Sequence, residues 1–461
     1  MGTGSIDPRR IGRESNVANT PYEFRQHTII SGLAVENYAR MNAVPDSVES
    51  AVQVRDFRYY LAFRFCLTLA LQMQGVVVGW QVYEITKSPL SLGLVGLAEA
   101  VSYIGTSLFG GHVADIVVRR RILLVCAAIY TACSVSLLGV TLFVPVTWPH
   151  LVLVFYFVIF LTGIARGFIA PAIYGVFAQV VPRRLYLNAG AWSANFWYAA
   201  AVAGPAFGGL IYGYLGVVAA YVTLILCLFA SIFSMWLLPS YPLEHKMQEE
   251  NVFQSISKGI AFVFSNQIIL GALSLDLVAV LFGGAVAMLP IFASDVLHTG
   301  PQGLGWLRAA TFLGSISMGL YMARNGPMRH AGIALFVCVA GFGASMIVFA
   351  LSKSFALSFA MLFLSGVFDS VSVIIRSTTL QLSMPDHMRG RVAAVNNIFI
   401  GTSNELGAFE SGFAARFLGL IPSVVMGGCI SILSVFVAAF AAPKLRALDL
   451  QALTKQDAPA K

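Results

Sequence analysis

The sequence predicts an all-α membrane protein of about twelve transmembrane helices in two pseudo-symmetric six-helix halves. Three observations lead to this prediction: 58% of the 461 residues are hydrophobic, only 11% are charged, and the apolar residues gather in long runs. A soluble domain has about 25% charged residues and no core large enough for so much apolar sequence. The excess must therefore face lipid.

Twelve apolar runs approach or exceed the roughly 20 residues that a spanning helix needs. They lie near residues 59–82, 92–113, 122–144, 151–173, 187–212, 217–238, 268–292, 303–323, 331–351, 355–377, 392–416 and 422–441. Most connections between them are short, so neighbouring helices are expected to run antiparallel.

The longest internal break falls between the sixth and seventh runs and divides the chain into two halves. We expect five parts: a polar, flexible cytoplasmic segment at 1–54, a first half at 55–239, a central cytoplasmic loop at 240–267, a second half at 268–442 and a cytoplasmic tail at 443–461. Apolar residues at helical spacing between Phe253 and Phe264 predict a short amphipathic helix at the membrane surface within the central loop.

The two halves repeat each other. A shift of 203 residues lays Gly163 on Gly366, Pro182 on Pro385, Gly204 on Gly407 and Gly209 on Gly412. Repeated six-helix halves are typical of secondary transporters, whose substrate site lies at the interface of the repeats.

Basic residues in alternate loops predict the orientation in the membrane. One set of loops holds Arg119, Arg120, Arg121, Arg183, Arg184, Arg324, Arg329, Arg389 and Arg391, whereas the alternate set holds little more than Lys87, Lys353 and Arg416. Loops rich in Lys and Arg stay in the cytoplasm. We therefore expect a multi-pass protein of the bacterial inner membrane with both termini cytoplasmic. The net charge of +8 is explained in this way, and no basic patch with interleaved aromatic residues predicts nucleic-acid binding.

The segment after the second run, residues 110–121, reads GGHVADIVVRRR and is a candidate cytoplasmic gate. Glycines such as Gly111 let helices approach closely. Asp115 can cap a short helix or pair with a basic residue. Arg119, Arg120 and Arg121 are expected to form charge pairs that break when the halves rock. The alternative is an ordinary positively charged turn.

The fifth run carries a second motif, Gly204, Pro205, Gly208 and Gly209. A proline within a helix frees a backbone carbonyl and kinks the helix. The glycines allow close contact with a neighbouring helix, and plain packing of small residues is the alternative reading.

Arg166 lies within the fourth run, in the sequence Gly-Ile-Ala-Arg-Gly. A charge near the bilayer centre costs about 2.5–3.5 kcal/mol, so it is normally paired and faces the protein interior. Five acids lie in other runs and are candidate proton carriers: Glu99, Asp276, Asp369, Glu405 and Glu410. A carboxyl group in an apolar site has its charged form disfavoured, which suits proton loading and release.

Among these acids Asp276 and Glu405 are the first choices, because each lies in a motif-like context. Arg376 follows Asp369 by two helical turns, so a structural pair of these two is the alternative for Asp369. Arg308 is a further expected partner for an acid. A structural ion pair is likewise the alternative for Arg166. Polar amides within spans prefer protein or water to lipid, which makes candidates for the substrate cavity of Gln72, Gln74, Asn195 and Asn404.

The segment at 110–121 resembles the signature of the major facilitator superfamily between its second and third helices. Its late arginine run, with residues 55–59, 274–277 and 404–407, resembles the branch that contains the enterobactin exporter and macrolide and drug exporters. The resemblance covers roughly residues 55–445 and departs from the signature at Ile116 and Val118. It implies a monomer, a role for Arg166 in proton coupling, and an antiporter motif at Gly204–Gly209, whose usual first glycine is here Ala200.

We therefore expect a secondary active transporter, working by alternating access as a proton-coupled exporter of an amphipathic small molecule such as a siderophore, macrolide or other drug. The alternatives are a facilitator or importer without proton antiport, and a non-transporting membrane sensor. An enzyme is not expected, because no HExxH or Ser/His set and no nucleotide-binding loop occurs. The expected partners are substrate, protons and lipid. The six cysteines form no CxxC pair, and neither a metal nor a cofactor is expected.

Overall fold

The computed structural model describes residues 50–241, 252–283, 285–325, 329–383 and 389–450, and no strand occurs in this part of the chain. The first half begins with the short turn η1 (Ala51–Gln53), and η2 (Arg183–Leu185) precedes its last helix. Its helices are α2 (Arg55–Thr86), α3 (Pro89–Ile116), α4 (Arg119–Phe143), α5 (Leu151–Val180) and α6 (Tyr186–Leu237).

The second half follows α7, which covers the stretch where an amphipathic helix is predicted. After α7 (Val252–Ser265) come α8 (Gln267–Gly283), η3 (Ala285–Met288), α9 (Leu289–Ile291), η4 (Phe292–Val296), α10 (Gly300–Asn325), α11 (Ala331–Leu351), α12 (Phe355–Ser383), α13 (Arg389–Leu418), α14 (Leu420–Ala441) and α15 (Pro443–Arg446). Most of the expected N-terminal segment and parts of the central loop and tail lie outside the described residues, at 1–49, 242–251 and 451–461.

The described helices are long enough for the twelve membrane crossings that the sequence predicts. Nine segments are long and apolar enough to span a bilayer. One of them, Arg183–Leu237, bends at Gly216, whose φ of 86° lies in the left-handed region, and so crosses twice. Helices α10 and α13, of 26 and 30 residues, are long enough for two further crossings that the sequence predicts, since both exceed the roughly 30 Å of a hydrocarbon core. The predicted all-α membrane fold is confirmed.

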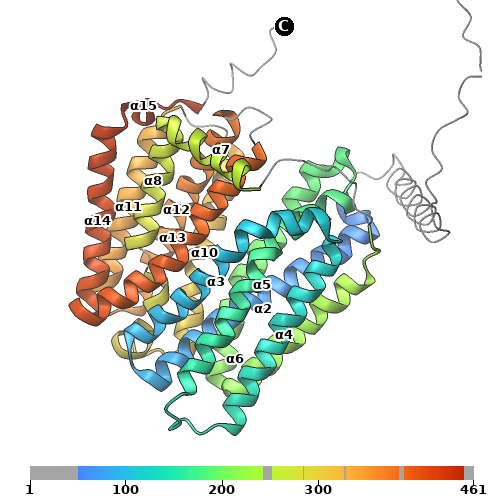
Figure 1. The fold of residues 1–461 in the computed structure, drawn as a ribbon. Helices are drawn as coiled ribbons and strands as arrows, with labels where there is room; N and C mark the ends of the chain where they lie inside the picture. Colours follow the sequence, from blue (N-terminus) through green and yellow to red (C-terminus); the bar gives the residue numbers. More distant parts are fainter. Residues whose placement is uncertain (1–49, 242–251, 284, 326–328, 384–388, 451–461) are drawn as a thin grey trace, which may run out of the picture.

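Helices α2–α6 form one group and α8–α14 a second, and the two groups lie side by side (Figure 1). Across the boundary between the halves, α3 packs mainly against α13 and α6 against α10. Within the first half α2 packs along α6, whereas α11 packs between α12 and α14 in the second. Two helix pairs, α3 with α13 and α6 with α10, therefore build the interface of the halves. Each pair has one helix from each half.

The two halves share a hydrophobic core at one end of the molecule, which we call the closed end. There Val82 and Leu92 of the first half join Leu289, Phe292 and Leu304 of the second in one buried cluster. Two further clusters each stay within a single half. The halves are thus joined at the closed end and keep separate cores elsewhere.

Polar and backbone contacts reinforce the closed end. Tyr83 at the end of α2 donates a hydrogen bond to Asp295 of η4, across the boundary between the halves. Close glycine approaches join α6 to α10 and α3 to α13 near the same end. The charged residues described next lie deeper along these helices, beyond the closed end.

Candidate functional site

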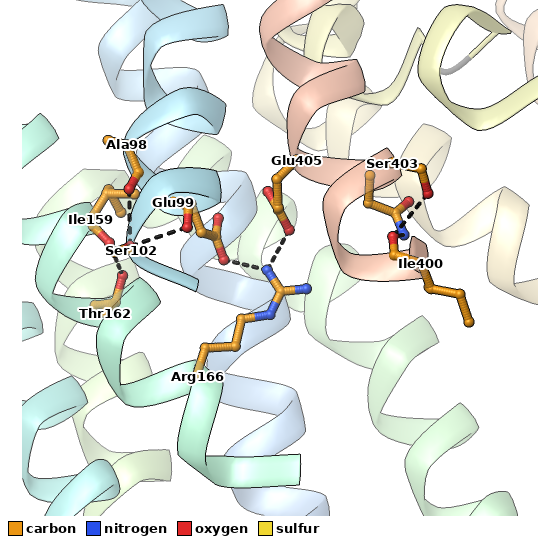
Figure 2. Close-up of polar contacts among 10 residues, drawn as sticks. Ala98, Glu99, Ser102, Ile159, Thr162, Arg166, Ile400, Ser403 and Glu405 are labelled. Atoms are coloured by element: carbon orange, nitrogen blue, oxygen red, sulfur yellow. Dashed lines mark hydrogen bonds and ion pairs between the residues drawn. The ribbon is translucent and has the colours of Figure 1, made fainter. Parts of the chain in front are cut away.

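Arg166 joins the two halves through two carboxylates. Its Nη1 donates to Glu99 Oε1 of α3 and, at 2.5 Å, to Glu405 Oε1 of α13. Figure 2 shows the guanidinium of α5 pointing between the two acids, which approach it from opposite sides. Of the six predicted proton-coupling residues, the structure brings these three together, and we call them the Arg166 cluster.

Glycines allow the three helices to approach closely enough for this contact. A β-carbon on Gly163, one turn before Arg166, would lie 3.0 Å from the carbonyl oxygen of Glu99. A β-carbon on Gly96, one turn before Glu99, would lie 3.2 Å from the carbonyl oxygen of Glu405. Glycine has no side chain, so the helices can approach closely at these two crossings. Arg166 is thereby placed between Glu99 and Glu405.

The surroundings of the Arg166 cluster are partly open and carry a second cation. The side chain of Arg166 is 38% exposed, whereas that of Glu405 is 11% exposed. The Tyr103 ring lies against the guanidinium, with 5.3 Å between its centroid and Cζ. Arg308 of α10 interacts electrostatically with both carboxylates at longer range.

The end of the Arg308 side chain lies beside a glycine of α2. A β-carbon on Gly75 would lie 2.6 Å from Nη1 of Arg308. The buried Nε of Arg308 has no hydrogen-bond partner among the described residues. The charges of Arg166 and Arg308 together balance those of Glu99 and Glu405. Both carboxylates nevertheless contact the guanidinium of Arg166.

This arrangement links charge to the relative position of the halves. Arg166 and Glu99 belong to the first half and Glu405 belongs to the second, so only the Arg166–Glu405 contact must break when the halves separate here. A carboxylate that loses its cation in an apolar environment is costly unless it takes up a proton. The site can therefore couple proton uptake to movement of the second half.

Asp276 is paired away from the Arg166 cluster. Arg376 of α12 forms a buried ion pair with Asp276 of α8, and the two side chains are 4% and 8% exposed. The alternative considered for Asp369, a structural pair with Arg376 of its own helix, is therefore not the contact that Arg376 makes. The two-turn spacing does place both on one face, but the carboxylate of α8 reaches the guanidinium instead.

Asp369 and Glu410 lie apart from the Arg166 cluster. Asp369 lines a small pocket of the second half together with Asp276 and Ser372. Glu410, five residues after Glu405, lines a different pocket with Ser411 and Ser423. The structure thus divides the predicted acids among three environments.

The helix-five motif packs in two directions. Gly204 and Gly208 of α6 lie against α2, where β-carbons would meet Gln72 Cβ at 2.6 Å and Met73 Cα at 3.2 Å. Gly209 lies against α10 of the other half, and Pro205 lies within the helix and faces the same crossing. The motif therefore holds the first half together and touches the second half at Pro205 and Gly209.

The candidate gate residues make their described contacts within the first half. Arg119 pairs with Asp115 at 3.8 Å and donates to the Gly175 carbonyl at 3.4 Å. Arg120 donates to the carbonyls of Met235 and Trp236 at the end of α6, at 3.1 and 2.7 Å.

Two further gate residues, Gly111 and Arg121, are exposed. A β-carbon on Gly111 would meet no atom within 4 Å, so this glycine serves no close helix crossing here. In this conformation the segment fastens α3, α5 and α6 to one another.

The four cavity candidates make no hydrogen bond with one another among the described residues. Gln74 is buried, and its Nε2 has no hydrogen-bond partner among the described residues. Gln72 lies at the crossing of α2 with α6. Asn195 and Asn404 are exposed, and Asn404 Nδ2 donates to the Ile400 carbonyl of its own helix at 2.8 Å.

Sequence reasoning missed Tyr103 beside the Arg166 cluster, and it named Arg308 as a partner for an acid without saying which acids Arg308 lies near. Tyr103 follows Glu99 by four residues, so it shares the helical face of an acid already identified. That spacing was a usable signal. Nothing in the sequence alone places Arg308 beside Gly75, because this depends on how the two halves pack.

Comparisons with known proteins identify a matching family and several relatives. A family model described as a transmembrane secretion effector, of the major facilitator type, matches residues 53–460. The enterobactin exporter EntS of Escherichia coli O1:K1 is 24% identical over 377 residues, which cover 81% of this chain and 88% of the relative. The same protein from strain E24377A matches equally.

Solved structures share the fold at low identity. A variant of the nucleoside transporter NupG superposes with a TM-score of 0.68 at 10% identity, covering 84% of this chain and all of that chain. A D-xylose-proton symporter superposes with a TM-score of 0.65 at 13% identity, covering 85% and 99%. At these identities the likeness shows the fold alone.

Proposed function

The chain belongs to the major facilitator superfamily, in its family of transmembrane secretion effectors, and from this we infer that it exports an amphipathic small organic molecule in exchange for protons. It is a multi-pass membrane transporter and not an enzyme. Direction, proton coupling and substrate class are the parts that we propose.

The observation that carries the proposal is the contact of Arg166 with one carboxylate from each half. Glu99 keeps its partner in any rigid movement of the two halves, since it belongs to the same half as Arg166. Glu405 loses its partner when α13 moves away from α3. A proton that binds Glu405 in the separated state removes an uncompensated buried charge. Re-forming the pair expels that proton, which ties proton movement to alternating access.

Loop charges support an orientation for this cycle. Arg119, Arg120 and Arg121 lie at the end opposite the closed end, which by the positive-inside rule faces the cytoplasm. We propose that the closed end faces outward and that both termini are cytoplasmic. The conformation described here then receives substrate from the cytoplasm, and the carrier works as a monomer in the bacterial inner membrane.

Three observations favour export. The description of the matching family refers to secretion, and the relative is an enterobactin exporter. The Gly204–Gly209 motif resembles the antiporter motif of the superfamily and also favours export. The second candidate is an importer, and the D-xylose-proton symporter among the structural neighbours shows only that this fold also occurs in a symporter. We propose siderophores, macrolides and other amphipathic drugs as the compounds to test first.

Everted membrane vesicles that contain the protein test direction and coupling together. An exporter accumulates labelled compound inside such vesicles when respiration acidifies their interior, and an ionophore that exchanges protons for potassium abolishes the accumulation. Arg166→Gln should lose accumulation as well. Accumulation that survives collapse of the pH gradient would identify a facilitator, and movement of compound only out of the vesicles would identify an importer.

A further inference from the structure

Arg308 of α10 is a cation of the second half that no acid contacts among the described residues. Its Nε is buried without a hydrogen-bond partner, and the side chain forms no ion pair with any described residue. The end of the side chain lies against Gly75 of α2, a helix of the first half. Buried charges are normally paired. The donors of this guanidinium are therefore available to a carboxylate that comes within reach.

The carboxylate that shares a half with Arg308 is Glu405. Arg308 interacts electrostatically with both Glu99 and Glu405, but Glu99 belongs to the first half, with Arg166. Helices α10 and α13 both belong to the second half, so they move together when the halves rock as rigid bodies. Arg308 therefore stays beside Glu405 when the Arg166–Glu405 contact breaks. Of these four side chains each half keeps one guanidinium and one carboxylate.

Exchange of a substrate for protons requires a second cation for Glu405. In one direction the halves separate with substrate and without a proton, so Glu405 leaves Arg166 as a carboxylate. In the other direction Glu405 carries the proton. A carboxylate without a cation is costly in an apolar environment. The movement that carries no proton is therefore possible only where another positive charge replaces Arg166.

We propose that Arg308 takes over Glu405 when Arg166 leaves it, and thereby lets the halves separate without a proton. This inference rests on the proposed transport function and adds the residue that controls its proton step. When α2 moves away from α10, the backbone of Gly75 leaves the end of the Arg308 side chain, which can then turn toward α13. Arg308 acts through Glu405 and is thus a positioning residue.

The other charged and ionisable groups around α13 leave this role to Arg308. Those that interact with Glu405 belong to the first half and depart with it: Arg166, Glu99 and Tyr103. Of the other elements packed against α13, η3 and α14 carry no acid or base. Helix α7 packs near the start of α13 and carries Lys258. Helix α8 carries Asp276, which is held by Arg376.

Opening of the closed end tests the proposal on the purified full chain without any substrate. Ala293 is buried in the closed end, so Ala293→Cys, in a chain without native cysteines, should react with a water-soluble maleimide only when this end opens. Two variants are compared at the same pH, which cancels the pH dependence of the thiol itself. The labelling rate of Arg308→Gln relative to the chain with Arg308 should fall about tenfold per pH unit in the alkaline range, because opening then takes up one proton.

Replacing both partners separates a role through Glu405 from a structural one. Arg308→Gln combined with Glu405→Gln should remove the pH dependence of this ratio, because no carboxylate is left to compensate. Arg308→Lys keeps the charge and should label like the chain with Arg308 at every pH. The matched control is Arg324→Gln, which removes an exposed arginine of the same helix and should leave the rate unchanged.

A labelling ratio for Arg308→Gln that does not change with pH would overturn the proposal. A pH-dependent ratio that persists in the double variant would also overturn it. Proton-linked opening that depends on Arg308 and Glu405 but is accompanied by no proton-driven transport would keep this role and refute the proposed function instead.

Discussion

Gly209 of α6 and Gly305 of α10 cross so closely that a β-carbon on Gly209 would lie 2.8 Å from the α-carbon of Gly305. Real β-carbons essentially never approach a backbone atom so closely. Helices α6 and α10 belong to different halves, so the closed end depends on the absence of side chains at this crossing. A larger residue here must push the halves apart.

Gly209→Val should shift the carrier away from the closed-end conformation. Overpacking a close contact costs about 1–3 kcal/mol, which corresponds to a change of roughly 5–150-fold in the ratio of the two conformations. The distance between spin labels at Ser88→Cys and Ser294→Cys, one in each half, should lengthen in a background without native cysteines. Gly190→Val is the control, because a β-carbon there meets no atom within 4 Å. An unchanged distance distribution in Gly209→Val would refute the role of this crossing.

Gly412→Val should act in the same direction through the second helix pair. A β-carbon on Gly412 of α13 would lie 2.6 Å from the α-carbon of Gly93 in α3. The same pair of spin labels measures the effect. Because the two crossings lie on different helix pairs, their free energies should add in the double variant. A shift toward the closed-end conformation would contradict the assignment of Gly412.

The equivalence of Gly209 and Gly412 is visible in the sequence. The 203-residue repeat lays one on the other, and each meets a glycine of the opposite half. Arg166 and Glu405 were also predicted, because charges within apolar runs stand out. The partner of Arg376 was not predicted. Helical spacing relates residues of a single helix only, whereas the choice between Asp369 and Asp276 depends on how α8 packs against α12.

Asp276→Ala should destabilise the protein more than any change to its exposed charges. Removing one member of a buried ion pair costs about 3–5 kcal/mol, because it leaves the other charge uncompensated. Arg376→Met in the same chain should recover much of this loss. Thermal unfolding in detergent, followed by intrinsic fluorescence, provides the comparison. If the double variant unfolds no later than Asp276→Ala, the Arg376–Asp276 pair does not account for the stability lost.

The central claim is that Glu405 carries the proton, and transport by Glu405→Gln in proteoliposomes tests it most directly. Two activities are compared in the same vesicles: accumulation of substrate driven by a pH gradient, and exchange of labelled for unlabelled substrate without a gradient. Glu405→Gln should lose accumulation and keep exchange, because alternating access persists while the proton-binding group is gone. Glu410→Gln, on the same helix but outside the Arg166 cluster, should keep both. Accumulation by Glu405→Gln at the rate of the wild type would contradict the account.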